Sequence, residues 1–105
     1  MPQFTIYQNK NPQTCSTVPF LLDVQNHLFS DLETRVVVPL RPIAAMKGKP
    51  LGTLMPVLEI EGDRFVLMTP ELAGIMKSEL GIPVTRVEQH RFEIIAAIDF
   101  LLTGS

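Results

Sequence analysis

The segment Val87–Ser105 constrains the fold of this chain more than any other part of the sequence. It is expected to form a helix that is apolar around most of its circumference, because Glu93 and Asp99 are the only charged residues between Phe92 and Leu102. At about 100° per residue, one face of that helix carries Ile94, Ile95, Ile98, Leu101 and Leu102. The roughly opposite face carries Phe92, Ala96 and Phe100.

A single apolar stripe is enough for a helix to pack on its own domain, so the second stripe predicts a second apolar contact. A dimer interface is the preferred interpretation, because a small sheet cannot cover a helix on both sides. The alternative is that the segment Arg41–Gly52 covers the second stripe as ordinary core.

Length and composition favour one globular domain over residues 1–105. Hydrophobic residues make up 46% of the chain and charged residues 19%, a balance typical of a packed core. No apolar run approaches the roughly 20 residues that span a bilayer, and no secretion signal is recognisable at the N-terminus. The lone Cys15 excludes an internal disulfide and fits a reducing compartment, so we expect a cytoplasmic protein.

The charge pattern argues against nucleic acid as the main ligand. The formal net charge is −2, and the nine Lys and Arg residues are scattered along the chain. Only Arg41–Lys49 is locally basic, and it contains no aromatic residue that could stack on a base. We therefore expect a protein target.

Short apolar segments predict a sheet built from residues 4–7, 20–24, 35–40, 55–60 and 64–68. Glu61-Gly62-Asp63 between the last two is a hairpin signal. Pro39 predicts that its strand ends at a sheet edge or a bulge. The expected fold class is mainly β with one C-terminal helix, as a strongly twisted antiparallel sheet or partial barrel.

Two segments precede the helix, and the first of them carries conflicting signals. Pro70–Lys77 reads as either helical or extended, because a Pro at a first turn followed by Glu, Leu and Ala favours a helix while Gly74 and Ile75 oppose it. Gly81-Ile82-Pro83 is expected to break regular structure before the helix.

The residues capable of chemistry give weak signals. Asp23 lies in an apolar run, where a carboxylate that accepts hydrogen bonds from loop amides is commoner than a catalytic one. His27 and His90 lack further ligands at metal-binding spacing, and Cys15 has no second Cys or His nearby, so no metal and no cofactor are expected.

One enzymatic alternative stays open, a metal-independent endoribonuclease acting by general acid–base chemistry. His27, Thr34, Arg35 and Thr69 supply suitable side chains. Nothing in their spacing requires that use, and Arg35 at a strand start is more often a surface or ion-pairing residue.

Several short motifs follow one another in a specific order. The clearest are Phe20–Gln25, Leu28-Phe29 and Thr34–Leu40, and they are preceded by Gln3–Tyr7 and followed by Val66–Thr69 and a C-terminal helix with Gly104. Each motif is short, but their order and spacing together are specific. With these motifs, essentially the whole chain resembles the CcdB family.

The resemblance implies an SH3-like partial barrel with extended chain over Pro70–Lys77, working as a homodimer. CcdB proteins are toxins of toxin–antitoxin modules and are not enzymes. They bind the DNA gyrase A subunit and trap gyrase on cleaved DNA, which blocks replication and transcription. A CcdA-like antitoxin neutralises the toxin and represses the shared operon together with it, so the toxin binds DNA only within that complex.

The family's gyrase-contacting positions match two places in this chain. These are the loop after the second predicted strand and the end of the helix with its tail: Leu28, Phe29, Asp99, Leu102, Thr103, Gly104 and Ser105. The best-known members end in Trp-Gly-Ile, whereas this chain ends in Thr103-Gly104-Ser105 and contains no Trp. The alternatives to a gyrase poison are an endoribonuclease toxin of the MazF type and a non-toxic homologue that only binds antitoxin.

Overall fold

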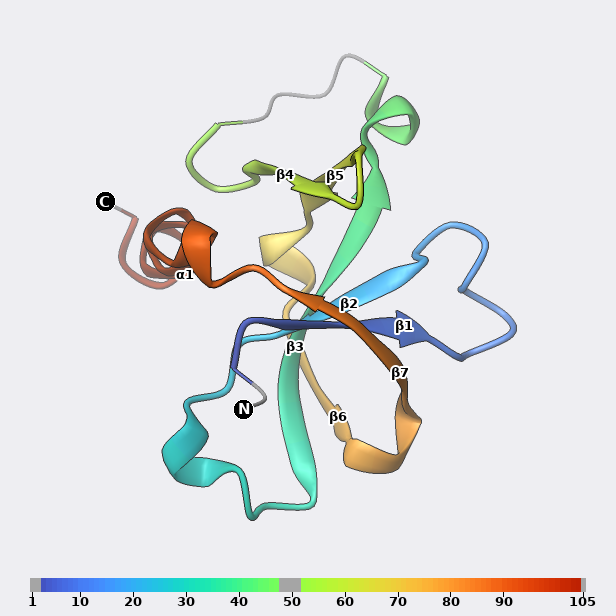
Figure 1. Ribbon diagram of the computed structural model, residues 1–105. Helices are drawn as coiled ribbons and strands as arrows, with labels where there is room; N and C mark the ends of the chain where they lie inside the picture. Colours follow the sequence, from blue (N-terminus) through green and yellow to red (C-terminus); the bar gives the residue numbers. More distant parts are fainter. Residues whose placement is uncertain (1–2, 48–51, 105) are drawn as a thin grey trace.

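In a computed structural model, the chain folds into a curled antiparallel sheet with one helix on its concave side (Figure 1). The structure describes residues 3–47 and 52–104. The strands follow the order β4-β5-β3-β2-β1-β7, and β6 pairs with β3 as well. This arrangement confirms the prediction of a mainly β fold with one C-terminal helix. The elements are β1 (Thr5–Asn9), β2 (Phe20–Asp23), β3 (Thr34–Pro42), β4 (Val57–Ile60), β5 (Asp63–Leu67), β6 (Ala73–Met76), β7 (Leu80–Arg86) and α1 (Arg91–Thr103).

The long strand β3 runs straight through Pro39, so the predicted end of a strand at this residue is wrong. Pro39 pairs with Leu21 of β2, and its carbonyl accepts a hydrogen bond of 2.9 Å from the Met68 N–H on the opposite side. Within a strand the N–H and C=O of one residue point the same way. The missing N–H of Pro39 therefore lies on the side of β3 where the neighbouring strand changes from β6 to β5. The hydrogen bonds between β3 and β2, on the other side, do not need it.

The hairpin between β4 and β5 confirms the turn prediction. Ile60 pairs with Asp63, which leaves Glu61 and Gly62 as the two loop residues. Their φ values are 53° and 90°, the left-handed region that a two-residue turn of type I′ requires at both positions.

Both segments that precede the helix contribute to strands. Residues 73–76 form β6, so the extended alternative for Pro70–Lys77 is correct for its second half, after a short 3₁₀ turn at Thr69–Glu71. Gly81-Ile82-Pro83 lies within β7, so the expected break there is wrong. A Pro is tolerated because β7 is an end strand and Pro83 pairs with Tyr7 between two register shifts.

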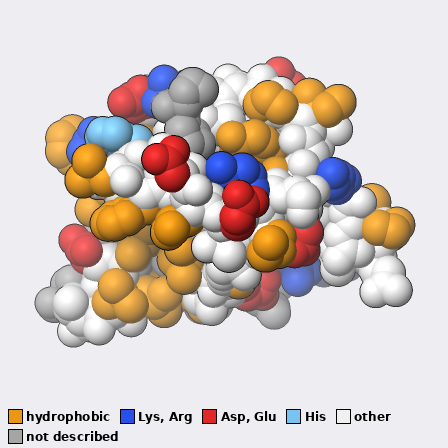
Figure 2. Space-filling model, turned by 90° about the horizontal axis from the view of Figure 1, so that it is seen from below, with side chains coloured by type: hydrophobic (Ala, Val, Ile, Leu, Met, Phe, Trp, Pro, Cys, Tyr) orange, Lys and Arg blue, Asp and Glu red, His pale blue; other side chains and the backbone are white. Residues whose placement is uncertain are grey.

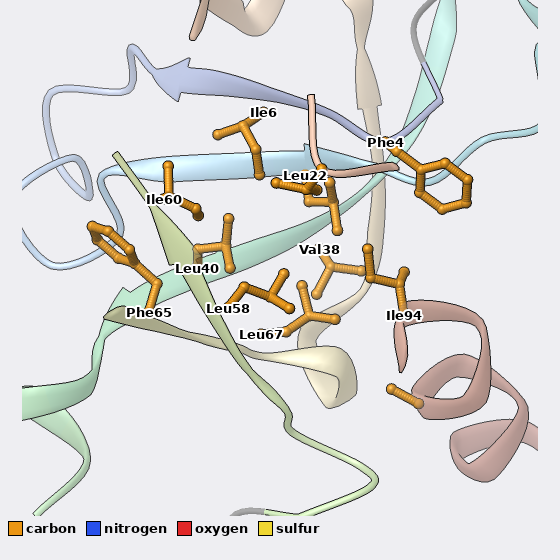
Figure 3. Close-up of a cluster of buried hydrophobic side chains, with 12 residues drawn as sticks. Phe4, Ile6, Leu22, Val38, Leu40, Leu58, Ile60, Phe65, Leu67 and Ile94 are labelled. Atoms are coloured by element: carbon orange, nitrogen blue, oxygen red, sulfur yellow. The ribbon is translucent and has the colours of Figure 1, made fainter. Parts of the chain in front are cut away.

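The main core lies between the sheet and α1. Side chains from β1 to β5 meet there, and Figure 3 shows Ile94 reaching from α1 toward Val38. Its buried members are Phe4, Ile6, Leu22, Val38, Leu40, Leu58, Ile60, Phe65, Leu67, Val87, Ile94 and Ala97. Val18, Leu21 and Val37 form a smaller cluster with Ile75 and Leu80, so Leu21 and Leu22 serve different clusters as the alternation of a strand requires.

Candidate partner-binding surface

The helix α1 presents one buried and one exposed face, and the exposed one differs partly from the prediction. It begins at Arg91, later than the predicted Val87, which is buried and precedes a 3₁₀ turn at Glu88–His90. Ile94 and Ala97 face the core. Phe92, at 82% exposure, and Leu102, at 75%, lie outside it. Leu102 was expected on the face of Ile94, and this expectation is wrong.

The exposed face follows from helical spacing. Phe92, Asp99 and Thr103 are separated by seven and four residues, so they lie in one row, with Leu102 beside it. Ala96 and Phe100 are exposed as well, so no described segment covers the second apolar stripe and the loop alternative loses support. The helix thus has an apolar surface that is free to meet another protein.

The end of α1 is closed by its own tail. Gly104 takes a φ of 76°, which a glycine adopts without steric cost, and its N–H donates to the Phe100 carbonyl at 2.8 Å. The Thr103 hydroxyl donates to the Asp99 carbonyl at 2.7 Å. Asp99, Leu102, Thr103 and Gly104 therefore form one ordered, exposed end of the helix, and Ser105 lies outside the described residues.

The loop between β2 and β3 carries the second set of predicted residues. Leu28 and Phe29 lie in a 3₁₀ turn, His27–Phe29, whose start is capped by the Asn26 side chain accepting from the Leu28 N–H at 2.9 Å. Leu28 is 76% exposed and Phe29 is more than half exposed. Leu32 in the same loop is also more than half exposed. It could not be predicted as a surface residue of the site, because a single Leu between polar residues carries no periodic signal.

Beneath this loop lies a buried ion pair. The Arg35 guanidinium donates to both carboxylate oxygens of Asp23, with distances of 2.8 and 3.1 Å, and only 2% of its side chain is exposed. The Gln25 N–H donates to the same carboxylate at 3.0 Å, as predicted for a structural Asp23. Arg35 is thus an ion-pairing residue and its expected alternative place on the surface is wrong.

The same environment affects Tyr7. Burial raises the pKa of the Tyr7 hydroxyl, the Asp23 carboxylate raises it further, and Arg35 partly opposes the effect. Tyr7, Asp23 and Arg35 therefore form one electrostatic group on the face of the sheet turned away from the main core.

The side chains of the endoribonuclease alternative are not presented together. His27 and Thr34 are exposed, whereas Arg35 and Thr69 are buried, and the Nε and Nη2 groups of Arg35 are both bound by Asp23. A substrate phosphate cannot replace that carboxylate without leaving a charge buried and unpaired. This alternative loses the cation on which it depended.

The loop and the last turn of α1 do not join into one surface within a single chain. Figure 1 places both on the same side of the molecule. Asn26 and His27 of the loop line a polar cavity of about 250 Å³ together with Arg91, the first residue of α1, so the loop adjoins the start of the helix and not its last turn. Figure 2 shows hydrophobic side chains gathered on this side, where Figure 1 has the loop and α1. The loop and the last turn of α1 are therefore two separate exposed surfaces on the same side of the molecule.

Within residues 3–47 and 52–104, no group of three His, Cys, Asp or Glu side chains is arranged to hold a metal ion. No helix in the same part of the chain is long and apolar enough to cross a membrane.

The family comparison agrees with this geometry over almost the whole chain. The family model described as CcdB protein matches residues 3–104, which include every strand, the loop and the helix. The chain therefore belongs to the CcdB family, whose members are toxins of toxin–antitoxin modules.

Proposed function

We propose that this protein is a toxin that binds the A subunit of DNA gyrase and traps gyrase on cleaved DNA in the cytoplasm. The observation that carries the proposal is the exposure of large apolar side chains at the positions where the family resemblance puts gyrase contacts. Leu28 and Leu102 are about three-quarters exposed, at 76% and 75%. Covering such side chains with a partner removes apolar surface from water, which favours binding.

The binding surface has two parts with different chemistry. Leu28 and Phe29 offer an apolar contact. The helix end, formed by Asp99, Leu102, Thr103 and Gly104, combines an apolar side chain with a carboxylate that pairs with no cation among the described residues. Ser105, the next residue of the sequence, belongs to the same proposed site. A basic patch on the target would complement Asp99.

The functional unit in this proposal is a homodimer. A second copy would cover exposed apolar side chains of α1 and bring two copies of the loop and helix end to one symmetric target. A CcdA-like antitoxin would bind the same dimer, release gyrase and repress the operon with it.

The test is a cleavage assay with purified protein, gyrase, supercoiled DNA and ATP. Accumulation of cleaved DNA supports the proposal, and Leu28→Asp should lower gyrase affinity at least tenfold, or about 1.4 kcal/mol. The matched control is Ile82→Asp, since Ile82 is 66% exposed on β7, away from the proposed surface. Equal losses for both variants contradict the proposed site.

A second function has its own observation in favour, the absence of Trp from the tail Thr103-Gly104-Ser105. An aromatic ring there can stack on cationic target groups, and this chain has none. Antitoxin binding without cleaved DNA would support a non-toxic homologue.

A further inference from the structure

The side chain of Gln25 connects the exposed loop to the sheet. Gln25 is 92% buried and lies two residues after the end of β2. Its Nε2 donates to the Phe29 carbonyl at 2.7 Å, and its Oε1 accepts from the Val36 N–H of β3 at 3.0 Å. One carboxamide thus joins the turn that carries Leu28 and Phe29 to the centre of the sheet.

Gln25 is itself fixed by the buried ion pair. Its N–H donates to Asp23 Oδ1 at 3.0 Å, and Asp23 is held by Arg35 from β3. The connected series Arg35, Asp23, Gln25, Phe29 therefore runs from the interior to the exposed loop. A change of the Gln25 side chain leaves the Phe29 carbonyl and the Val36 N–H, both partly buried, without these hydrogen bonds.

The far side of the loop is attached independently. The Lys77 N–H donates to the Glu33 carbonyl at 2.7 Å, and its Nζ donates to the Ser30 carbonyl at 3.0 Å. All of these attachments use backbone groups of the loop. The side chains of Leu28, Phe29 and Leu32 remain exposed while the backbone that carries them is held.

We propose that Gln25 is a positioning residue, which holds the Leu28–Phe29 turn in a preformed conformation for partner binding. Ordering a free loop on association costs binding free energy, and a loop already held by the protein avoids that cost. The identity of the partner as gyrase rests on the proposed function. The fixed conformation of the loop does not depend on it, because it follows from the hydrogen bonds of Gln25.

Gln25→Glu keeps one of the two hydrogen bonds of this side chain and removes the other. The carboxylate still accepts from the Val36 N–H, but its second oxygen meets the Phe29 carbonyl and repels it. Protonation at low pH restores a donor, and burial raises the pKa of a carboxyl group so that this occurs under mild conditions. Gln25→Met is the companion variant, because it has similar length and lacks donor and acceptor at every pH. Gln13→Glu, at an exposed loop position, is the matched control for charge.

The measurement is amide hydrogen exchange by NMR, expressed as protection factors at pH 7 and pH 5, together with gyrase affinity at both values. In Gln25→Glu at pH 7, protection of Phe29 and Ser30 should fall at least tenfold while the β4–β5 hairpin stays protected. Gyrase dissociation constants should rise at least tenfold. Both effects should recede at pH 5 in Gln25→Glu and persist in Gln25→Met, with Gln13→Glu and the unmodified protein as references.

Unchanged loop protection in both Gln25 variants overturns the inference. So does lost protection with unchanged gyrase affinity, because the held conformation is then irrelevant to binding. If the unmodified protein does not bind gyrase, the proposed function fails separately, and the loop protection in the two variants then decides whether Gln25 shapes this surface.

Discussion

Arg35 and Asp23, twelve residues apart in the sequence, form a bidentate ion pair that is almost completely removed from solvent. The pair joins β3 to the end of β2 at the base of the exposed loop. Removal of one partner from a buried pair leaves an uncompensated charge, which typically costs more than the pair itself contributes.

We therefore expect Arg35→Leu to destabilise the protein by about 3–5 kcal/mol. The double variant Asp23→Leu/Arg35→Leu should recover a large part of that loss, because no buried charge remains unpaired. Urea unfolding of the single and double variants measures both values. Equal instability of the two would show that the pair is needed for more than charge compensation, as the bond from Gln25 to Asp23 allows.

The raised pKa of Tyr7 predicts that the protein loses stability at alkaline pH. Its pKa in the folded protein is raised, so the unfolded chain releases the proton first, near pH 10, while the folded chain keeps it. The contribution of Tyr7 to stability is therefore constant below about pH 10 and falls as the pH rises toward the raised pKa. Urea unfolding of the parent protein and Tyr7→Phe between pH 8 and 11.5 should show a steeper alkaline decline in the parent.

The ionisation itself can be followed directly. Tyr7 is the only Tyr of the chain, which contains no Trp, so absorbance near 295 nm reports on this hydroxyl alone. A midpoint at or below pH 10 in the folded protein would contradict the prediction.

Thr69 offers a stabilising substitution. Its side chain is fully buried at the start of the 3₁₀ turn Thr69–Glu71, and its hydroxyl has no hydrogen-bond partner among the described residues. Val has nearly the same shape and lacks the unsatisfied hydroxyl, so Thr69→Val should raise the unfolding free energy by about 1 kcal/mol. Thermal unfolding tests this, and Thr69→Ser, which keeps the hydroxyl and adds a cavity, should be less stable than the parent.

Phe92 tests the proposed dimer. Its ring is 82% exposed on the outward face of α1, so Phe92→Glu should leave the fold intact. If a second copy covers this face, the variant should weaken the dimer at least tenfold in analytical ultracentrifugation, since a charge would be buried in the interface. Ile82→Glu on β7 is the control, and a similar dimer constant for both variants would place the interface elsewhere.

Several elements of this protein follow from local sequence patterns. Short apolar segments, one alternating and one with three consecutive Val residues, predicted β1 to β5, and Glu61-Gly62-Asp63 predicted the β4–β5 hairpin because only a few residues suit a turn of this type. The apolar C-terminal segment predicted the helix, although its start was placed four residues early. The ordered motifs identified the family, which the match over residues 3–104 confirms.

The contacts between residues far apart in the sequence depend on the tertiary structure. Asp23 and Arg35 pair because β2 and β3 lie side by side, and no local pattern encodes that meeting. Pro39 is tolerated inside β3 because its missing N–H faces the place where β5 replaces β6. Leu102 is exposed because the sheet covers only one side of α1, so which apolar side chains are buried depends on what the helix packs against. Apolar periodicity and turn chemistry are local properties of a chain. The pairing of strands and charges and the burial of side chains depend on which distant segments pack together in the fold.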